Sequence, residues 1–373
     1  MSETTETFAP GEFLKEEMEA RGWTQIELAE IMGRPTKVVN EIIAGKKAIT
    51  PETAVQLGDA LGTGPELWMN LESHYQLSRV GAKDNVIARR AALYERFPVR
   101  DMIKRGWIEA SENIDVLEHQ FSTYFGLKSL TDKASFGAYA AKKAAPIEKL
   151  SMPQLAWLLR AQSIAKSQII KKYSGEKLKD AIAELSNLRT APEEARHVSK
   201  ILNSCGVRFV LVEALPSSKI DGACFWLAND QPAIAMSLRL DRIDNFWFVL
   251  RHELEHVLLG HGRNDDGYVL DVDVEGMDHQ KIAKEERLAN DAAAEFCVPQ
   301  IELQDFIDRV TPYFSEEKVV LFARRLQIHI GLVAGQLRKK LDRYDRWSTH
   351  LAKVRDIVTK SAPVDGWGLV EHS

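Results

Sequence analysis

Residues 246–261 read FWFVLRHELEHVLLGH, and this stretch decides how the C-terminal part of the chain folds. Its apolar residues recur at the spacing of one helical face, which predicts a buried amphipathic helix. Residues 252–256 read HELEH, so His252 and His256 lie four positions apart. Residues four apart share one face of a helix, and both imidazoles can therefore reach one metal ion. Glu253 lies beside His252, close enough to reach a water at that ion, and Zn²⁺ is the metal that this spacing predicts.

A charged helix face with two incidental histidines is the alternative interpretation of the same residues. The flanking residues argue against it, because Phe248, Val249, Val257 and Leu258 would bury both imidazoles. Burying such polar groups is costly unless they have partners. The flanks therefore favour the metal site.

Catalytic zinc usually has three protein ligands, so a third is needed. His261 lies five positions after His256, whereas the third histidine of metzincins lies six after, and Leu259 stands where they have a glycine. We therefore expect His261 at the helix end, where it would donate a hydrogen bond to a ligand histidine and not bind the metal itself.

Glu286 is the other candidate for the third ligand, and it opens an alanine-rich helical stretch that reaches Pro299. Asn290 lies four positions later on the same face, where it could hold a ligand imidazole in place. Acidic residues are also favoured at helix starts by the dipole, so Glu285 and Glu286 could simply be solvated. The residues alone leave both interpretations open.

Three β-rich runs precede this helix, at 207–213, 223–227 and 233–237. Asn229-Asp230 predicts a turn between the last two runs, and Asp221-Gly222 predicts another before the second. An edge strand beside a metal site is a common way to hold an extended peptide.

The N-terminal segment shows start and stop signals for five short helices. Thr24 with Glu27 forms a capping box, Thr36 is expected to cap the next helix, and Thr50-Pro51 starts another. Two short helices joined by a turn with a glycine, at 24–32 and 36–44, predict a helix-turn-helix.

Polar and basic side chains around the second of these helices are candidates for DNA contact. Asn40 and Gln25 suit a base edge, and the lysines suit phosphates. The candidate DNA-binding residues are Gln25, Arg34, Thr36, Lys37, Asn40, Lys46 and Lys47. Residues 1–80 hold 7 Lys+Arg against 13 Asp+Glu, which leaves open a five-helix interaction module with solvated lysines. The net negative charge of this segment would weaken DNA binding by a single copy. We therefore expect a homodimer on a palindromic double-stranded DNA operator.

Residues 11–71, GEFLKEEMEARGWTQIELAEIMGRPTKVVNEIIAGKKAITPETAVQLGDALGTGPELWMNL, resemble the helix-turn-helix (XRE-like) domain of HigA-type antitoxins. The resemblance implies a dimeric repressor that often neutralises a partner toxin.

Three C-terminal stretches resemble the ImmA/IrrE family of metallopeptidases. They are DGACFWLANDQPAIAMSLRLDRIDNFWFVLRHELEHVLLGH (221–261), EERLANDAAAEFCVP (285–299) and FARRLQIHIGLVAGQLRKK (322–340). The resemblance implies that His252, His256 and Glu286 are the zinc ligands and Glu253 the catalytic residue. It also implies regulated proteolysis of a repressor or a cognate toxin.

This chain departs from the pattern of the family at two positions. Leu288 stands where the family usually has Glu or Gln, and Ala292 stands where it usually has Phe. Neither position is a ligand, so these departures bear on packing more than on zinc.

We therefore expect an α+β chain, mostly α, with a small antiparallel or mixed sheet in a gluzincin-like domain. The expected domains are a helix-turn-helix at 1–80, a basic helical middle region at 81–200 and the metallopeptidase domain at 201–373. The three cysteines are widely spaced, which predicts reduced thiols in a cytoplasmic protein. The sequence has no apolar run of membrane length and no recognisable signal peptide, so we expect no membrane partner. Two alternatives stay open: a non-proteolytic repressor whose metal domain senses or scaffolds, and a toxin domain restrained by its own N-terminal half.

Overall fold

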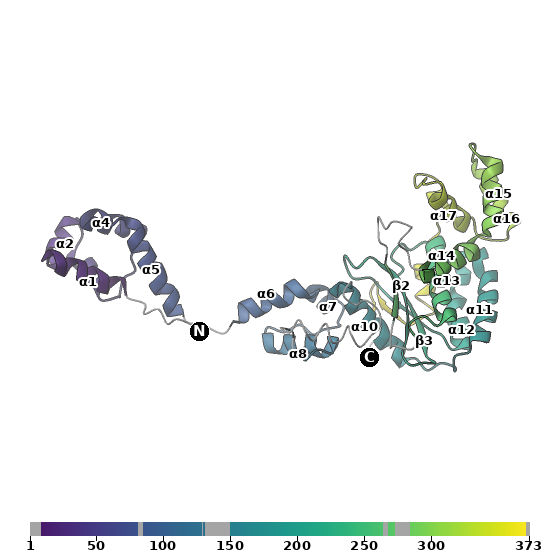
Figure 1. Ribbon diagram of the computed structural model, residues 1–373, viewed down its shortest axis with the longest axis horizontal. Helices are drawn as coiled ribbons and strands as arrows, with labels where there is room; N and C mark the ends of the chain where they lie inside the picture. The colour runs from purple at the N-terminus through teal and green to yellow at the C-terminus, as the bar shows by residue number, and fades with distance from the viewer. Residues whose placement is uncertain are drawn as a thin grey trace. The chain divides into compact units, whose positions relative to one another are not determined.

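The computed structural model describes residues 9–80, 85–128, 130, 150–263, 268–272 and 284–370 (Figure 1). It divides the chain into two compact units, Met1–Ala88 and Arg89–Ser373. The sequence predicts a separate middle region at residues 81–200. From Arg89 onward, the described residues of this region belong to the second unit.

The first unit contains the five predicted helices. They are α1 (Pro10–Arg21), α2 (Gln25–Ile31), α3 (Thr36–Ile43), α4 (Pro51–Leu61) and α5 (Pro65–Val80). Their apolar faces meet in one core, where Leu14, Leu28, Leu57 and Trp68 are fully buried. The capping box at α2 is confirmed, because the Thr24 side chain accepts from the backbone N–H of Glu27 while the Glu27 carboxylate accepts from Thr24.

The predicted cap of α3 is wrong. Thr36 is the first residue of the helix, and Pro35 takes the N-cap position with φ −60° and ψ 138°. The pyrrolidine ring fixes the φ of Pro35, its ψ makes the residue extended, and proline has no side-chain group that could cap the helix.

The second unit surrounds one mixed sheet with helices. The helices before the sheet are α6 (Val86–Arg96, which begins in the first unit), α7 (Val99–Lys104), α8 (Ile114–Phe125), α10 (Met152–Ser167), α11 (Gly175–Asn187) and α12 (Val198–Cys205), with short 3-10 turns at Leu188–Thr190 and Pro192–His197. The helices after its third strand are α13 (Ile243–Leu259), α14 (Lys284–Cys297), α15 (Gln300–Val310), α16 (Glu316–Arg325), α17 (Ile330–Lys340) and α18 (Arg355–Val358), with a 3-10 turn at Ser348–His350.

The strand order across the sheet is β4-β2-β3-β1-β5-β6. The strands are β1 (Arg208–Val212), β2 (Ile220–Trp226), β3 (Pro232–Met236), β4 (Tyr268–Val272), β5 (Val364–Gly366) and β6 (Leu369–Val370). β1 runs parallel to β3 and β5, and the other pairs are antiparallel. The three predicted strands and the mixed character are confirmed, whereas β4, β5 and β6 were not predicted.

The two faces of the sheet carry different helices (Figure 1). α10 packs on one face, where the Trp157 indole donates to the carbonyl of Val212 at 2.7 Å. α13 packs over β2 and β3 on the other face, which presents Cys224, Ile234 and Met236 to the main core. The predicted buried helix is therefore confirmed, and its position on this face fixes what its polar residues can reach.

Gly222 lies inside β2, so the turn predicted at Asp221-Gly222 is wrong. A Cβ added at Gly222 would lie 2.8 Å from Glu253 Oε1 and 2.8 Å from Val249 Cγ1. A glycine within a strand often marks such a close approach. The glycine therefore lets α13 lie close enough to β2 to bring Glu253 against the strand.

We expect Gly222→Ala to destabilise the second unit by about 1–3 kcal/mol, because the added methyl group overpacks a tight contact. Calorimetric unfolding of the full chain measures this. Gly175→Ala is the matched control, since a Cβ there meets only Tyr173 Oη at an ordinary 3.6 Å. Equal stability of the two variants would contradict the close approach.

All three cysteines are free and buried. Burial raises the pKa of Cys205 to about 11 and that of Cys297 to about 12, and it raises that of Cys224 well above its usual range. Within the described ranges no helix is long and apolar enough to cross a membrane.

We expect these thiols to be silent towards Ellman's reagent in the native protein at pH 8, because a raised pKa keeps them protonated and burial blocks access. All three should react once guanidinium unfolds the chain. Fast reaction of any thiol in the native state would contradict the burial.

Candidate metal centre

Helix α13 carries three polar side chains into an apolar interior. His252 is 1% exposed, and Glu253 and His256 are fully buried. Their neighbours Trp247, Leu250 and Leu254 pack into the main core. Because the apolar residues hold the helix against the sheet, the imidazoles are held away from water.

The two imidazoles meet a carboxylate from α14. His252 Nε2 lies 3.0 Å from His256 Nε2, and the Glu286 oxygens lie 3.4 Å from His252 Nε2 and 3.6 Å from His256 Nε2. Two atoms that each bind one tetrahedral zinc ion at 2.0–2.1 Å lie about 3.3 Å apart. The 3.4 Å separation is to Glu286 Oε2 and the 3.6 Å separation is to Oε1, so two imidazoles and one carboxylate lie close enough together to hold one metal ion.

Glu286 is ionised in this environment. Burial by itself raises the pKa of a carboxyl group, but hydrogen bonds from His252 and His256 outweigh it and lower the pKa of Glu286 to about 2. The group is therefore a carboxylate, which is the form that binds a metal.

His261 lies just beyond α13, where the chain turns at Gly260 in the left-handed conformation (φ 71°). Its Nδ1 lies 2.7 Å from Nδ1 of His256. Burial lowers the pKa of His261, which favours a neutral ring that can share one proton with His256. A hydrogen bond on the outer nitrogen of a ligand histidine is what fixes its ring and tautomer.

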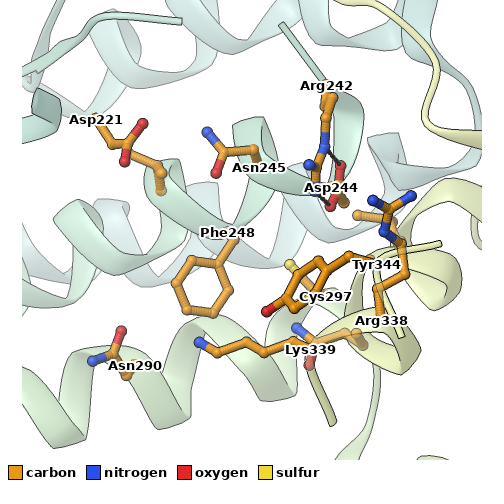
Figure 2. Close-up of a pocket in the computed structure, with 14 residues that line it drawn as sticks. Asp221, Arg242, Asp244, Asn245, Phe248, Asn290, Cys297, Arg338, Lys339 and Tyr344 are labelled. Carbon is orange, nitrogen blue, oxygen red and sulfur yellow. Dashed lines mark hydrogen bonds and ion pairs between the residues drawn. The ribbon is translucent and has the colours of Figure 1, made fainter. Parts of the chain in front are cut away.

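Asn290 lies one turn after Glu286 on α14. It makes no hydrogen bond within the described parts of the chain and instead lines a cavity beside Phe248 (Figure 2). Phe248 in turn stacks on His252, with ring centroids 6.4 Å apart. Asn290 is thus close to the cluster without holding a ligand ring. Its predicted second-shell role stays a prediction.

The candidate DNA-binding residues lie on α2, α3 and the loops that follow them. Asn40 donates to Gln25 at 3.2 Å, which places the two predicted base-reading side chains together. Lys37 lies 3.7 Å from Glu41, and Lys46, Lys47 and Thr36 are exposed. Arg34 instead contacts two residues of the first unit. It donates a hydrogen bond to Gln56 at 2.9 Å and forms an ion pair with Glu52 at 2.5 Å.

Residues 14–68 match the family model described as Helix-turn-helix. The N-terminal unit carries a helix-turn-helix domain. The HTH-type transcriptional regulator YddM of Escherichia coli is 29% identical over 69 residues, which are 18% of this chain and 73% of that protein. Antitoxin HigA-1 of Vibrio cholerae is 41% identical over 63 residues, 17% of this chain and 59% of that protein.

A solved structure of an addiction module antidote protein of a HigA family, from Coxiella burnetii, is 28% identical with a TM-score of 0.19. It covers 29% of this chain and 98% of that chain. The reported similarities thus concern the N-terminal part of the chain, which is antitoxin-like, and the metal centre is argued from its own geometry.

We expect the purified protein to hold about one zinc ion per chain, because three ligands and an open position suit that metal. His256→Ala should lose most of the zinc, and Glu286→Gln should weaken binding substantially. Elemental analysis after dialysis against a chelator measures both. Asp291→Asn on the same helix is the matched control, since its side chain is exposed. Full zinc retention in Glu286→Gln would reassign the third ligand.

Proposed function

We propose that the chain is a DNA-binding, antitoxin-like transcriptional regulator that carries a zinc-dependent endopeptidase. The observation that supports the peptidase is the convergence of His252, His256 and Glu286, with the buried Glu253 beside them. The same ligand chemistry, two imidazoles and one carboxylate, occurs in zinc peptidases.

A zinc ion bound there would polarise a peptide carbonyl and make water acidic enough to lose a proton near neutral pH. Glu253 would take that proton, because it is buried on α13 directly after His252 and lies against Gly222 of β2. The same carboxyl group can then deliver the proton to the leaving nitrogen. His261 would hold His256 through the contact between their Nδ1 atoms.

The sheet offers a means of binding an extended peptide. β4 is the outermost described strand next to β2, so its outer edge is paired with no described strand. A substrate that adds to this edge would gain main-chain hydrogen bonds irrespective of its sequence. β4 pairs with β2, and Gly222 of β2 lies against Glu253. The exposed edge is therefore one strand away from Glu253.

The helix-turn-helix would determine which proteins the peptidase meets. Because both units belong to one chain, binding of the helix-turn-helix to DNA raises the local concentration of the peptidase near that DNA site. We therefore propose a homodimer on a palindromic operator, with a repressor or a cognate toxin bound nearby as the protein substrate.

A repressor with no proteolytic activity is the second candidate, because residues 14–68 match the helix-turn-helix family model and antitoxin HigA-1 is 41% identical over 63 residues. In that case the metal centre senses or scaffolds. A toxin domain restrained by its own N-terminal half is a third candidate.

We expect Glu253→Gln to keep its zinc and to lose cleavage of partner proteins by at least about 100-fold, because it removes the proton acceptor and none of the ligands. Mass spectrometry of partner proteins incubated with each variant measures this. In cells, a reporter under the native promoter should stay repressed by Glu253→Gln under the inducing condition. Derepression equal to wild type would favour the non-proteolytic repressor.

We expect a fragment of residues 1–80 to bind its operator more weakly than the full chain. Lys46→Ala should lower affinity for all sequences, since it removes a phosphate contact. Asn40→Ala should relax specificity at a cost of about 1–3 kcal/mol. Gel shifts with specific and scrambled DNA measure both, and Lys15→Ala on α1, paired with Glu19 at 3.7 Å, is the control. Unchanged binding by both variants would favour a protein-interaction module.

A further inference from the structure

The turn after α13 carries His261, whose main-chain N–H and carbonyl are both hydrogen-bonded. The N–H donates to the carbonyl of His256 at 3.0 Å, and the carbonyl accepts from the indole N–H of Trp226 at 2.9 Å. The His261 ring lies with its Nδ1 2.7 Å from Nδ1 of His256. Because both main-chain groups are bonded, the ring can move chiefly through its side-chain torsions.

Trp226 reaches this turn from the last position of β2. Alternate residues of a strand lie on one face, so Gly222 and Trp226 share the face of β2 that meets α13. Gly222 lies against Glu253, and Trp226, four residues later, contacts the turn beyond the end of the helix. β2 therefore contacts α13 at a polar residue of the cluster and again just past its C-terminus.

Further contacts hold the indole ring and the turn against one another. Trp226 is 3% exposed, and Tyr173 packs edge-on against it with ring centroids 5.5 Å apart. The guanidinium of Arg263, in the same turn as His261, lies 5.2 Å from the centre of the indole ring. Arg263 Nε also donates to the carbonyl of Asn229, between β2 and β3, at 2.5 Å. The β2–β3 hairpin thus holds the turn through both Trp226 and Asn229.

Buried tryptophans usually find a partner for the indole N–H, so packing alone would account for a bond of this kind. Trp157 is such a case on the other face of the sheet, where it donates to the carbonyl of Val212. Trp226 differs in the residue whose carbonyl it holds. The ring of His261 contacts the outer nitrogen of His256, and such a partner fixes the orientation and tautomer of a ligand histidine.

We propose that Trp226, supported by Arg263, is a positioning residue for the metal centre and acts through His261 on His256. The proposal rests on the metal site of the proposed function and does not require proteolysis. The indole fixes the main chain of His261, and the His261 ring in turn orients the His256 ring, whose Nε2 faces the cluster. Loss of the indole N–H would free the turn and leave His256 with a less fixed partner.

The test measures zinc binding by the full chain in competition with a chromophoric chelator. Trp226→Phe keeps an aromatic ring and removes the indole N–H. We expect it to raise the dissociation constant for zinc about three- to tenfold, which is the order of one hydrogen bond. His261→Ala removes the partner of His256 directly and should raise the constant about 10- to 100-fold.

Trp157→Phe is the matched control, because it too loses an indole bond to a main-chain carbonyl, at 2.7 Å and on the opposite face of the sheet. Its zinc affinity should equal that of the wild type. Thermal melting of the metal-free variants should show a similar loss of stability for Trp157→Phe and Trp226→Phe, so that a difference in zinc binding is not a difference in folding.

A double-mutant cycle separates positioning from a general effect on the fold. If Trp226 acts through His261, then Trp226→Phe should not weaken zinc binding further in a His261→Ala background. A tryptophan that only stabilises the fold would weaken binding by the same factor in both backgrounds, and this result would overturn the proposal. Arg263→Met, at an exposed position, takes the place of Trp226→Phe in the same cycle if the latter unfolds.

The outcome for the wild type distinguishes this proposal from the metal site on which it rests. If the wild type binds zinc and Trp226→Phe binds it equally tightly, the positioning role is wrong and the metal site stands. If the wild type itself fails to bind zinc, the metal site is wrong.

Discussion

Placing polar groups inside an apolar helix-sheet interface is the constraint on which the second unit depends. Helix α13 must present His252, Glu253 and His256 inward while the rest of its inner surface packs into the main core. Such groups are tolerated there only if each has a partner. Neighbouring elements supply them: the Glu286 carboxylate comes from α14, and His261 comes from the turn after α13.

This arrangement explains why small residues occur where large ones would pack better. Gly222 leaves room for Glu253 against β2, and Gly335 of α17 plays the same part for Asp244, since a Cβ there would lie 2.3 Å from Asp244 Oδ2. At both positions a larger residue would collide with the carboxylate side chain of α13.

Much of the fold could be predicted from the sequence, because the signals were local. Helix caps such as Thr24 with Glu27, and the spacing of His252 and His256, depend on residues within one or two turns. The strands β5 and β6 are too short for any alternation to identify them, and Asp221-Gly222 has the composition of a turn although it lies inside β2. The role of Gly222 and the contact of Trp226 with His261 depend on segments distant in the chain, so no local pattern could indicate them. Glu286 could be named only as one of two interpretations until α14 placed it beside the histidines.

Glu286, the proposed third ligand, lies thirty positions after His256, on a separate helix. An ion bound by both would act as a cross-link that joins the two ends of a long loop, much as a disulfide does. An ion that binds only the folded state stabilises it by an amount that rises with the logarithm of its free concentration. The packing of α14 against α13 would then depend on zinc supply, and metal starvation would loosen the fold at the point where chemistry is expected.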